Sequence, residues 1–368
     1  IIGLKFLLPI AYIDNGIMNK IVLDILIDLA KNVADDTTDM NEEQEEAINA
    51  ILKQFLKYPY LLRFLALQCP FNDLERLASS MLRIWSAKNI THIFIADLIE
   101  DEINFVSRNM DILRRNSLAT RTLAIFSRVK GTEFLDRTVK PIIDDIVVEG
   151  LDFEIEKNIK DPIEKQKHVE RFVQCIDNFA DNIGKSIDFL PDEFFYISQK
   201  IYQAANKKFP GSELISVGSF IFLRFFCPAI VNPESETIKD RISATNRRTL
   251  ILVAKFLQNL ANQTISSLKW PLLENQKAKI DEWNLRMFTF LAKVSSFEKK
   301  TSIESNWSAP LSNLESVGTL HTLMYSNVTS LKSAMIDTVI DKESFDSLLE
   351  SSEVLDKSLQ KLGQPTLE

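Results

Sequence analysis

The stretch from Ser212 to Pro233 constrains the fold most, because it predicts a helix that is apolar on nearly every side. A helix of this kind belongs in the interior of a protein. Ser212 can cap its start, and Pro228 is expected to end it at or just before Cys227. Arg224 stands among phenylalanines, and a buried guanidinium needs carboxylates, backbone carbonyls or a place at the floor of a groove. The stretch therefore predicts a core helix that carries one charge with a specific task.

Apolar residues recur at helical spacing along most of the remaining chain. The alternating segment 152–159 has no neighbour with which to pair, so we expect an extended connector there, and a linker over 298–312. We find no internal repeat and predict an all-α fold, an irregular multi-helix bundle. The expected helices cover 19–31, 48–56, 61–67, 73–87, 90–106, 116–128, 132–148, 162–183, 192–207, 212–227, 246–261, 281–294, 320–336 and 344–362.

Charge and motif content limit the classes of function. The net charge of −8 argues against nucleic acid as the main partner. The three cysteines and three histidines are scattered, which disfavours a disulfide framework, a zinc site and a histidine-based catalytic cluster. The sequence holds no Gly-rich phosphate loop, nucleophile elbow or metal motif. Chains without such motifs are usually binding modules, so the residues alone favour a binding function.

Residues 1–13 are apolar, but they are fewer than the roughly 20 that a bilayer span needs, and they include Lys5 and Pro9. They also lack the basic flank of a signal peptide. Because the chain begins with Ile1, we expect a fragment of a longer protein in which this segment is a buried helix of an upstream helical array. We expect no direct membrane insertion.

Basic residues gather in two segments of this acidic chain, whereas 35–46 carries seven acids and is expected to be a linker or a helix start. Residues 108–140 contain eight bases against three acids, and 239–255 contain five bases against Asp240. Such segments predict either a local site for an anionic partner or a solvated basic face. Arg114 and Arg115 fall in a loop just before a helix that Asn116 or Ser117 would cap. A guanidinium there suits phosphate oxygens, including those in another protein's active site.

Three motifs resemble the catalytic domain of Ras GTPase-activating proteins, most closely the neurofibromin branch and its fungal counterparts. They are RRNSLAT (114–120) followed by FLDRTVKPII (134–143), then FLRFFCPAIVNP (222–233), then RTLILVAKFLQNLAN (248–262). The resemblance implies a catalytic domain over 75–298. It also implies the end of an upstream helical region over 1–35, accessory helices over 36–74, and further accessory helices over 299–368.

The resemblance implies a role for each matching position. Arg114 matches the arginine finger, which enters the active site of the GTPase. Arg224 matches the arginine that braces the finger loop by bonding its backbone carbonyls. The remaining residues expected at the partner-binding surface are Arg115, Asn116, Ser117, Leu118, Ala119, Thr120, Phe222, Leu223, Pro228, Ala229, Lys255 and Gln258.

A mechanism in trans follows from this resemblance. The expected partner is a Ras-type small GTPase in its GTP-bound state, and GTP and Mg²⁺ belong to that partner, so the chain needs no cofactor. Arg114 would supply the positive charge that the GTPase lacks, and the chain would have no active site of its own. We expect a cytoplasmic protein that reaches the membrane through its partner. The alternatives are a non-catalytic GTPase-binding scaffold of the same fold, and a helical scaffold that binds peptides.

Overall fold

The computed structural model describes residues 40–149, 153, 161–233, 242–265, 270–296, 314–336 and 342–365. Every regular element in these ranges is helical, and no strand occurs among them. The prediction of an all-α fold is therefore confirmed. The expected helix at 19–31 and the linker at 298–312 lie outside the described residues, as does the connector at 152–159 except for Phe153.

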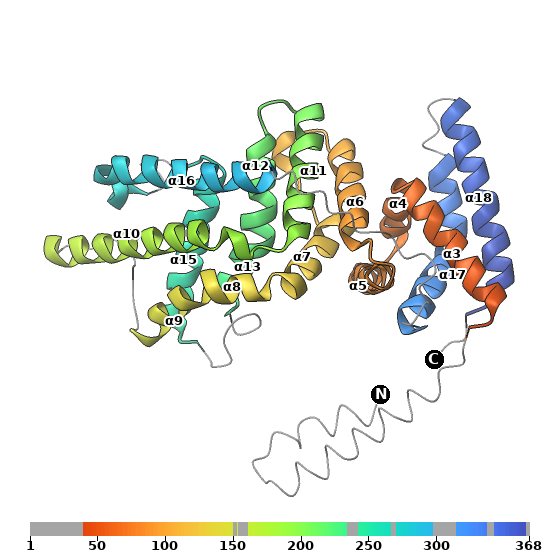
Figure 1. The fold of residues 1–368 in the computed structure, drawn as a ribbon, viewed down its shortest axis with the longest axis horizontal. Helices are drawn as coiled ribbons and strands as arrows, with labels where there is room; N and C mark the ends of the chain where they lie inside the picture. The colour runs from red at the N-terminus through yellow and green to blue at the C-terminus, as the bar shows by residue number, and fades with distance from the viewer. Residues whose placement is uncertain are drawn as a thin grey trace, which may run out of the picture.

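The helices form two groups along the long axis of the molecule (Figure 1). The first group, which we name the accessory bundle, consists of α3 (Glu42–Lys57), α4 (Tyr60–Gln68), α17 (Leu314–Ile336) and α18 (Lys342–Leu362). The second group, the central helices, consists of α6 (Thr91–Phe105), α7 (Leu118–Lys130), α8 (Thr132–Thr138), α9 (Lys140–Val148), α10 (Pro162–Lys185), α11 (Asp192–Lys208), α12 (Glu213–Gly218), α13 (Cys227–Val231), α15 (Ala244–Ala261) and α16 (Lys277–Ser295). Helix α5 (Phe71–Ala87) packs against both α17 and α7, so it joins the two groups.

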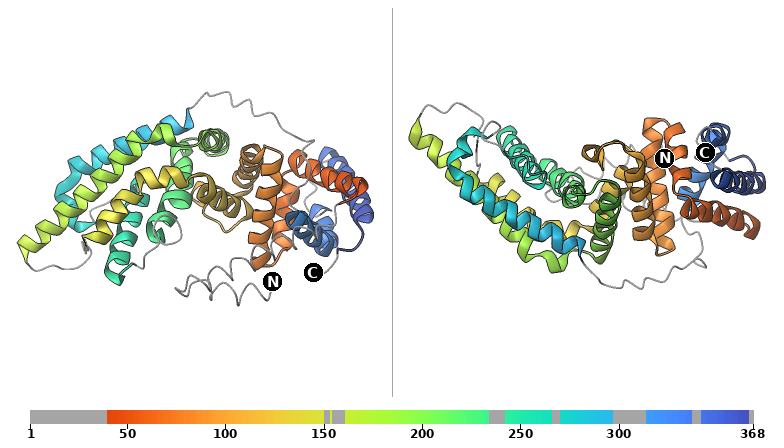
Figure 2. Two further views of the ribbon diagram at one scale, coloured as in Figure 1. Left: turned by 60° about the horizontal axis from the view of Figure 1, so that its bottom comes forward. Right: turned by 90° about the horizontal axis from the view of Figure 1, so that it is seen from above.

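The accessory bundle brings the two ends of the described chain together (Figure 2). Helix α3 packs on α18, and α4 packs on α17. Inside the bundle the Ser351 hydroxyl donates to Gln54 Oε1 at 3.0 Å. Asn41 caps α3, and the acidic residues that follow lie in its first turn, where the helix dipole favours negative charge. The part of the acidic run from 42 onward is thus a helix start, one of the two expected forms.

The apolar stretch that begins at Ser212 runs through the interior as three continuous segments: α12, a π-helix labelled η3 (Ser219–Phe226), and α13. It is long and apolar enough to cross a membrane, but 67% of its most apolar window is buried in the protein, as expected of a core helix. Phe225 lies 4.9 Å from Phe194 and 5.2 Å from Phe226, ring centroid to centroid. This aromatic core surrounds the helix that carries Arg224.

Two expectations for this stretch are wrong. The helix does not end before Pro228, because the Cys227 N–H donates to Phe222 O, five residues back, and helical geometry continues to Val231. A wider π turn thus leads into the proline, which has no N–H of its own to donate. Ser212 occupies the N-cap position, but its hydroxyl donates to Phe209 O at 2.6 Å and makes no cap bond.

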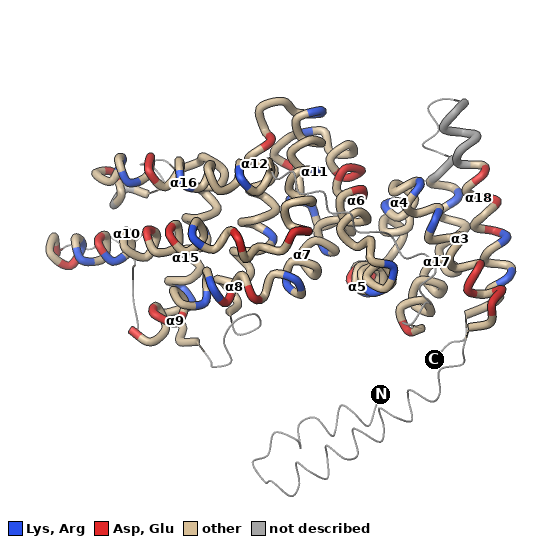
Figure 3. Tube along the Cα trace, in the orientation of Figure 1, with Lys and Arg blue, Asp and Glu red and all other residues tan. Residues whose placement is uncertain are grey.

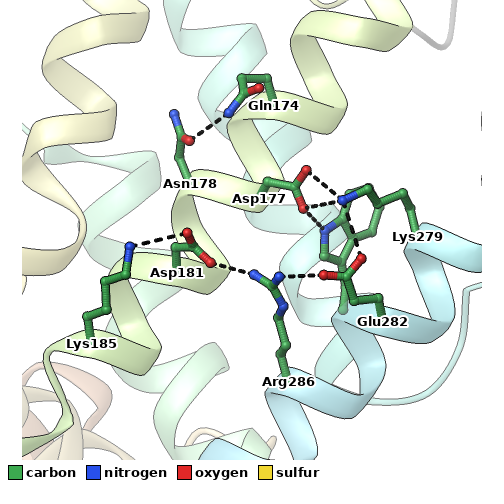
Figure 4. Close-up of polar contacts among 9 residues, drawn as sticks. Gln174, Asp177, Asn178, Asp181, Lys185, Lys279, Glu282 and Arg286 are labelled. Carbon is green, nitrogen blue, oxygen red and sulfur yellow. Dashed lines mark hydrogen bonds and ion pairs between the residues drawn. The ribbon is translucent and has the colours of Figure 1, made fainter.

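A polar network joins α10 to α16 (Figure 4). The Asp177 carboxylate accepts from Lys279 Nζ at 3.1 Å and from the buried Trp283 Nε1 at 2.7 Å. One turn further along α10, Asp181 accepts from the Arg286 guanidinium. Carboxylates on one helix thus hold cations and an indole on the other, which keeps the two helices in register.

Candidate functional site

The two consecutive arginines lie in the loop between α6 and α7, residues 106–117, which we name the arginine loop. Ser117 ends this loop as the N-cap of α7. Its Oγ accepts from the Thr120 N–H at 3.2 Å, and Thr120 Oγ1 accepts from the Ser117 N–H at 3.0 Å. This capping box confirms a cap at 116 or 117 and assigns it to Ser117. The local sequence thereby sets the point where the loop becomes helix.

Lys208, at the end of α11, anchors the entrance of the loop. Its Nζ donates to Ile103 O at 3.0 Å and also to the carbonyls of Asn104 and Val106. The last carbonyls of a helix lack partners within the helix, and a cation is favourable at that end. Lys208 therefore fixes the direction in which the chain leaves α6. Nothing in the sequence indicated this contact.

Arg224 anchors the middle of the loop. Its Nε donates to Leu113 O at 2.8 Å, and its Nη2 donates to Arg115 O at 3.2 Å. Leu113 is fully buried and has φ of 54°, a left-handed conformation that is unfavourable for leucine. Burial lowers the pKa of Arg224, and the nearby Glu102 charge partly offsets this effect. The half-buried Arg224 thus stabilises a backbone shape that the loop would not adopt by itself.

Glu102 of α6 anchors the exit of the loop. This carboxyl is 5% exposed, accepts from the Ser117 hydroxyl, and leaves its Oε1 without a partner among the described residues. Burial raises the pKa of Glu102, while the Ser117 hydrogen bond and the charges of Arg115 and Arg224 oppose that shift. The buried Glu102 carboxyl therefore lies close to Ser117, at the end of the loop, and to Arg224, which holds the middle of the loop.

The two arginines of the loop point in different directions. Arg114 Nη2 donates to Asn262 Oδ1 at 2.8 Å, so its side chain reaches toward the end of α15. The Arg115 guanidinium lies 5.0 Å from the Phe105 ring centroid, so it turns back toward α6. Both side chains are exposed, and in the described part of the chain neither has a carboxylate within ion-pair distance. The two consecutive side chains therefore have different surroundings.

Arg115 lies beside a small cavity behind the loop. Phe105 is in contact with both Arg115 and Arg63, and the guanidinium carbon of Arg63 lies 4.4 Å from the ring centroid. The cavity has a volume of about 90 Å³, and Leu98 and Glu102 also line it. Arg63 itself is paired with Asp101 of α6 at 2.7 Å. Arg115 therefore belongs to the packing that supports the loop from the α6 side.

Three polar residues lie along one face of α15. Lys255, Gln258 and Asn262 are spaced i, i+3 and i+7, which places them on the same side of the helix. Lys255 is exposed, with its Nζ 5.5 Å from the Trp270 ring centroid, and Gln258 is half-buried. Asn262 was absent from the predicted site, although it is the last residue of the third motif and shares the face of Gln258. Its contact with Arg114 spans 148 residues of sequence.

The other residues expected at the partner-binding surface differ in how far their side chains are exposed. Asn116 is exposed and accepts from Arg121 Nε at 3.0 Å, while Leu223 and Pro228 are half-buried. Five side chains are buried and support this surface from beneath, so they offer no side-chain contact to a partner: Leu118, Ala119, Thr120, Phe222 and Ala229.

The basic segment 108–140 is largely balanced by carboxylates (Figure 3). Five of its eight bases form ion pairs: Arg108 with Asp111, Arg121 with Glu75, Lys130 with Glu193, Arg137 with Glu133, and Lys140 with Asp144. Some of these acids lie outside the segment, which is why a count along the sequence overstated its free charge. In the second basic segment, residues 239 and 241 lie outside the described part, and Arg247 donates to Val231 O at 3.1 Å.

Comparison with known proteins places part of this chain in a family. Residues 154–262 match the family described as GTPase-activator protein for Ras-like GTPase, RasGAP. The chain is 37% identical over 302 residues to "Inhibitory regulator protein IRA2" of Saccharomyces cerevisiae, covering 82% of this chain and 10% of that protein. It is 31% identical over 367 residues to "Inhibitory regulator protein IRA1" of the same yeast, covering 100% of this chain and 12% of that protein.

A more distant relative is human "Ras GTPase-activating protein 1", 28% identical over 258 residues, which cover 68% of this chain and 24% of that protein. The chain spans about a tenth of the length of the two yeast relatives. The matched family segment includes Arg224 and Asn262, whereas the arginine loop precedes it along the chain. The chain therefore contains a domain of the RasGAP family, built around the helix that carries Arg224 and the helix that ends at Asn262.

Proposed function

We propose that this chain accelerates GTP hydrolysis by a Ras-type small GTPase in its GTP-bound state. The observation that carries the proposal is Arg114, an exposed arginine on a loop whose backbone is held by Arg224. The guanidinium meets a neutral acceptor and no carboxylate in the described part of the chain, so its charge is available to a partner. The family match of residues 154–262 and the name of the human relative, "Ras GTPase-activating protein 1", support this function.

Arg114 would act by stabilising charge that develops in the partner's active site. Negative charge builds up on the β–γ bridging oxygen and on the γ-phosphate as GTP is hydrolysed, and a guanidinium offers planar donors to both. In the established case of Ras with its activators, such an arginine accelerates hydrolysis by about 10³–10⁵-fold, roughly 4–7 kcal/mol. The three anchors of the loop would keep the backbone that carries this donor in place before the reaction, which contributes to the preorganisation that electrostatic catalysis requires.

In this proposal the chain acts in trans and supplies no nucleotide, metal or active site of its own. GTP and Mg²⁺ would remain bound to the GTPase, whose own glutamine would orient the attacking water. The expected location is the cytoplasm, with access to the membrane through the partner.

Single-turnover hydrolysis of GTP bound to a Ras-type GTPase tests the proposal. We expect strong acceleration by the unchanged chain, near-complete loss with Arg114→Ala, and a smaller loss with Arg115→Ala, because Arg115 supports the loop from the α6 side. Loss with Arg115→Ala alone would make Arg115 the finger. Binding to the GTP-bound GTPase without acceleration would instead identify a non-catalytic scaffold.

A further inference from the structure

We propose that Asn262 is a positioning residue that holds the Arg114 side chain across the surface between the arginine loop and α15 before the GTPase binds. The inference rests on the function proposed above and adds a residue to its machinery. Asn262 touches no reacting atom in this proposal. It acts only through the guanidinium that it holds.

The need for such a residue follows from how the loop is anchored. Lys208, Arg224 and Glu102 hold the α6 carbonyls, the loop carbonyls and Ser117, so they fix the backbone and leave the Arg114 side chain to be placed by other means. A free arginine side chain samples many rotamers and loses that freedom when it is ordered. The hydrogen bond from Arg114 Nη2 to Asn262 Oδ1, at 2.8 Å, orders it in advance.

Asn262 is itself held in place, which makes it a suitable anchor. It is the C-cap of α15, and its N–H donates to Gln258 O at 3.0 Å. Its side chain is half-buried. The acceptor therefore sits on the end of a packed helix, opposite a loop that is fixed by different elements.

The chemical type of the acceptor matters as much as its position. A hydrogen bond from a guanidinium to a neutral amide is weaker than one to a carboxylate, and it leaves the positive charge unopposed. The guanidinium can therefore leave Asn262 for phosphate oxygens. Asp111, whose charge reaches Arg114, is already engaged by Arg108 through two bonds of 2.8 and 2.9 Å. The surroundings thus orient Arg114 without capturing it.

The test compares two changes at one position by the maximal single-turnover rate at saturating chain. With Asn262→Ala the side chain loses its acceptor, and we expect a reduction of about two- to fivefold from lost preorganisation. With Asn262→Asp the guanidinium gains a carboxylate that retains it and cancels its charge, and we expect a reduction of at least about tenfold. The affinity for the GTP-bound GTPase should change less than the rate in both cases.

A purely structural role predicts the opposite order. Aspartate preserves the shape of Asn262 and its ability to accept a hydrogen bond, so it should then be the milder change. Gln263→Glu is the matched control, since it adds the same charge at the next, exposed residue; we expect its rate within about twofold of the unchanged chain. Thermal unfolding of each variant excludes misfolding as the cause of a lower rate.

The outcomes separate this inference from the function on which it depends. If the unchanged chain does not accelerate hydrolysis, the proposed function fails. If it does, and Arg114→Ala abolishes the effect, then equal or higher activity of Asn262→Asp relative to Asn262→Ala overturns the positioning role alone. An equally large loss with Gln263→Glu would likewise overturn it, because the effect would then reflect added charge in general.

Discussion

Two arginines of this molecule, the half-buried Arg286 and the exposed Arg114, have contrasting hydrogen-bond partners. Arg286, at the interface of α10 and α16, is bonded by the carboxylates of Asp181 and Glu282 (Figure 4). Arg114, in the arginine loop, is bonded by the amide oxygen of Asn262. Carboxylates fix a guanidinium and cancel its charge, whereas an amide orients it and leaves the charge in place. The partner of an arginine thus indicates whether it serves the fold or is kept available for another molecule.

The largest expected effect is the loss of activity in Arg114→Ala. We expect the maximal rate of stimulated hydrolysis to fall by about 10³-fold or more, with little change in thermal stability, because the side chain is exposed. Arg286→Ala makes the same chemical change at the other arginine. It should leave the rate within about twofold, since the ion pairs of this half-buried side chain lie at the interface of α10 and α16 and contribute to stability alone. A loss of rate with Arg286→Ala would break the comparison.

The next largest effect is expected from Arg224→Ala. This change removes the donors to Leu113 O and Arg115 O and releases a strained backbone. We expect the maximal rate to fall by roughly 10²-fold, as when a catalytic group is misplaced by about 1 Å, with a smaller loss of affinity for the GTPase. Titration of the rate against chain concentration separates the two quantities. A defect confined to affinity would show that Arg224 does not position the loop.

Asp177→Ala tests the structural side of the comparison. The change leaves the buried Trp283 Nε1 without its acceptor, so we expect the free energy of unfolding to fall by about 1–3 kcal/mol. The maximal rate at a temperature well below the transition should not change. Asn178→Ala, on the same helix in an exposed pair with Gln174, is the control and should cost less than about 0.5 kcal/mol in urea unfolding. Equal losses of unfolding free energy in Asp177→Ala and Asn178→Ala would show that the hydrogen bond from Trp283 Nε1 does not contribute measurably to stability.

The smallest effect is expected from Glu102→Gln and depends on pH. Burial raises the pKa of Glu102 above its ordinary value of 4.5, so the folded state binds its proton more tightly than the unfolded state does. This group therefore favours the folded state below pH 4.5, and that contribution is lost as pH rises through the folded-state pKa. Urea unfolding of both proteins should show the variant gaining stability relative to the unchanged chain as pH rises. A constant difference, or one that shrinks as pH rises, would contradict this account.

Much of the fold could be predicted from the sequence, because helices depend on local spacing. Apolar periodicity located most of the α-helices that the structure describes, although the helix expected over 132–148 is divided at Val139 into α8 and α9. Ser117 was one of two expected caps for α7. The continuation of the helix past Pro228 could not be predicted from local spacing. It depends on a π turn inside a packed aromatic core, and a proline usually ends a helix when only its neighbours are considered.

The candidate site likewise has features that the sequence predicted and features that only the structure shows. By itself, the sequence determined that Arg224 must find acceptors, because a buried guanidinium that cannot lose its proton requires them. It also placed two arginines in an exposed loop before α7. Only the tertiary structure decided that Arg114 turns to Asn262 and Arg115 to Phe105, and that Lys208 closes the end of α6. These contacts join residues far apart in the chain, and the direction of a side chain in a loop depends on the helices that packing brings beside it.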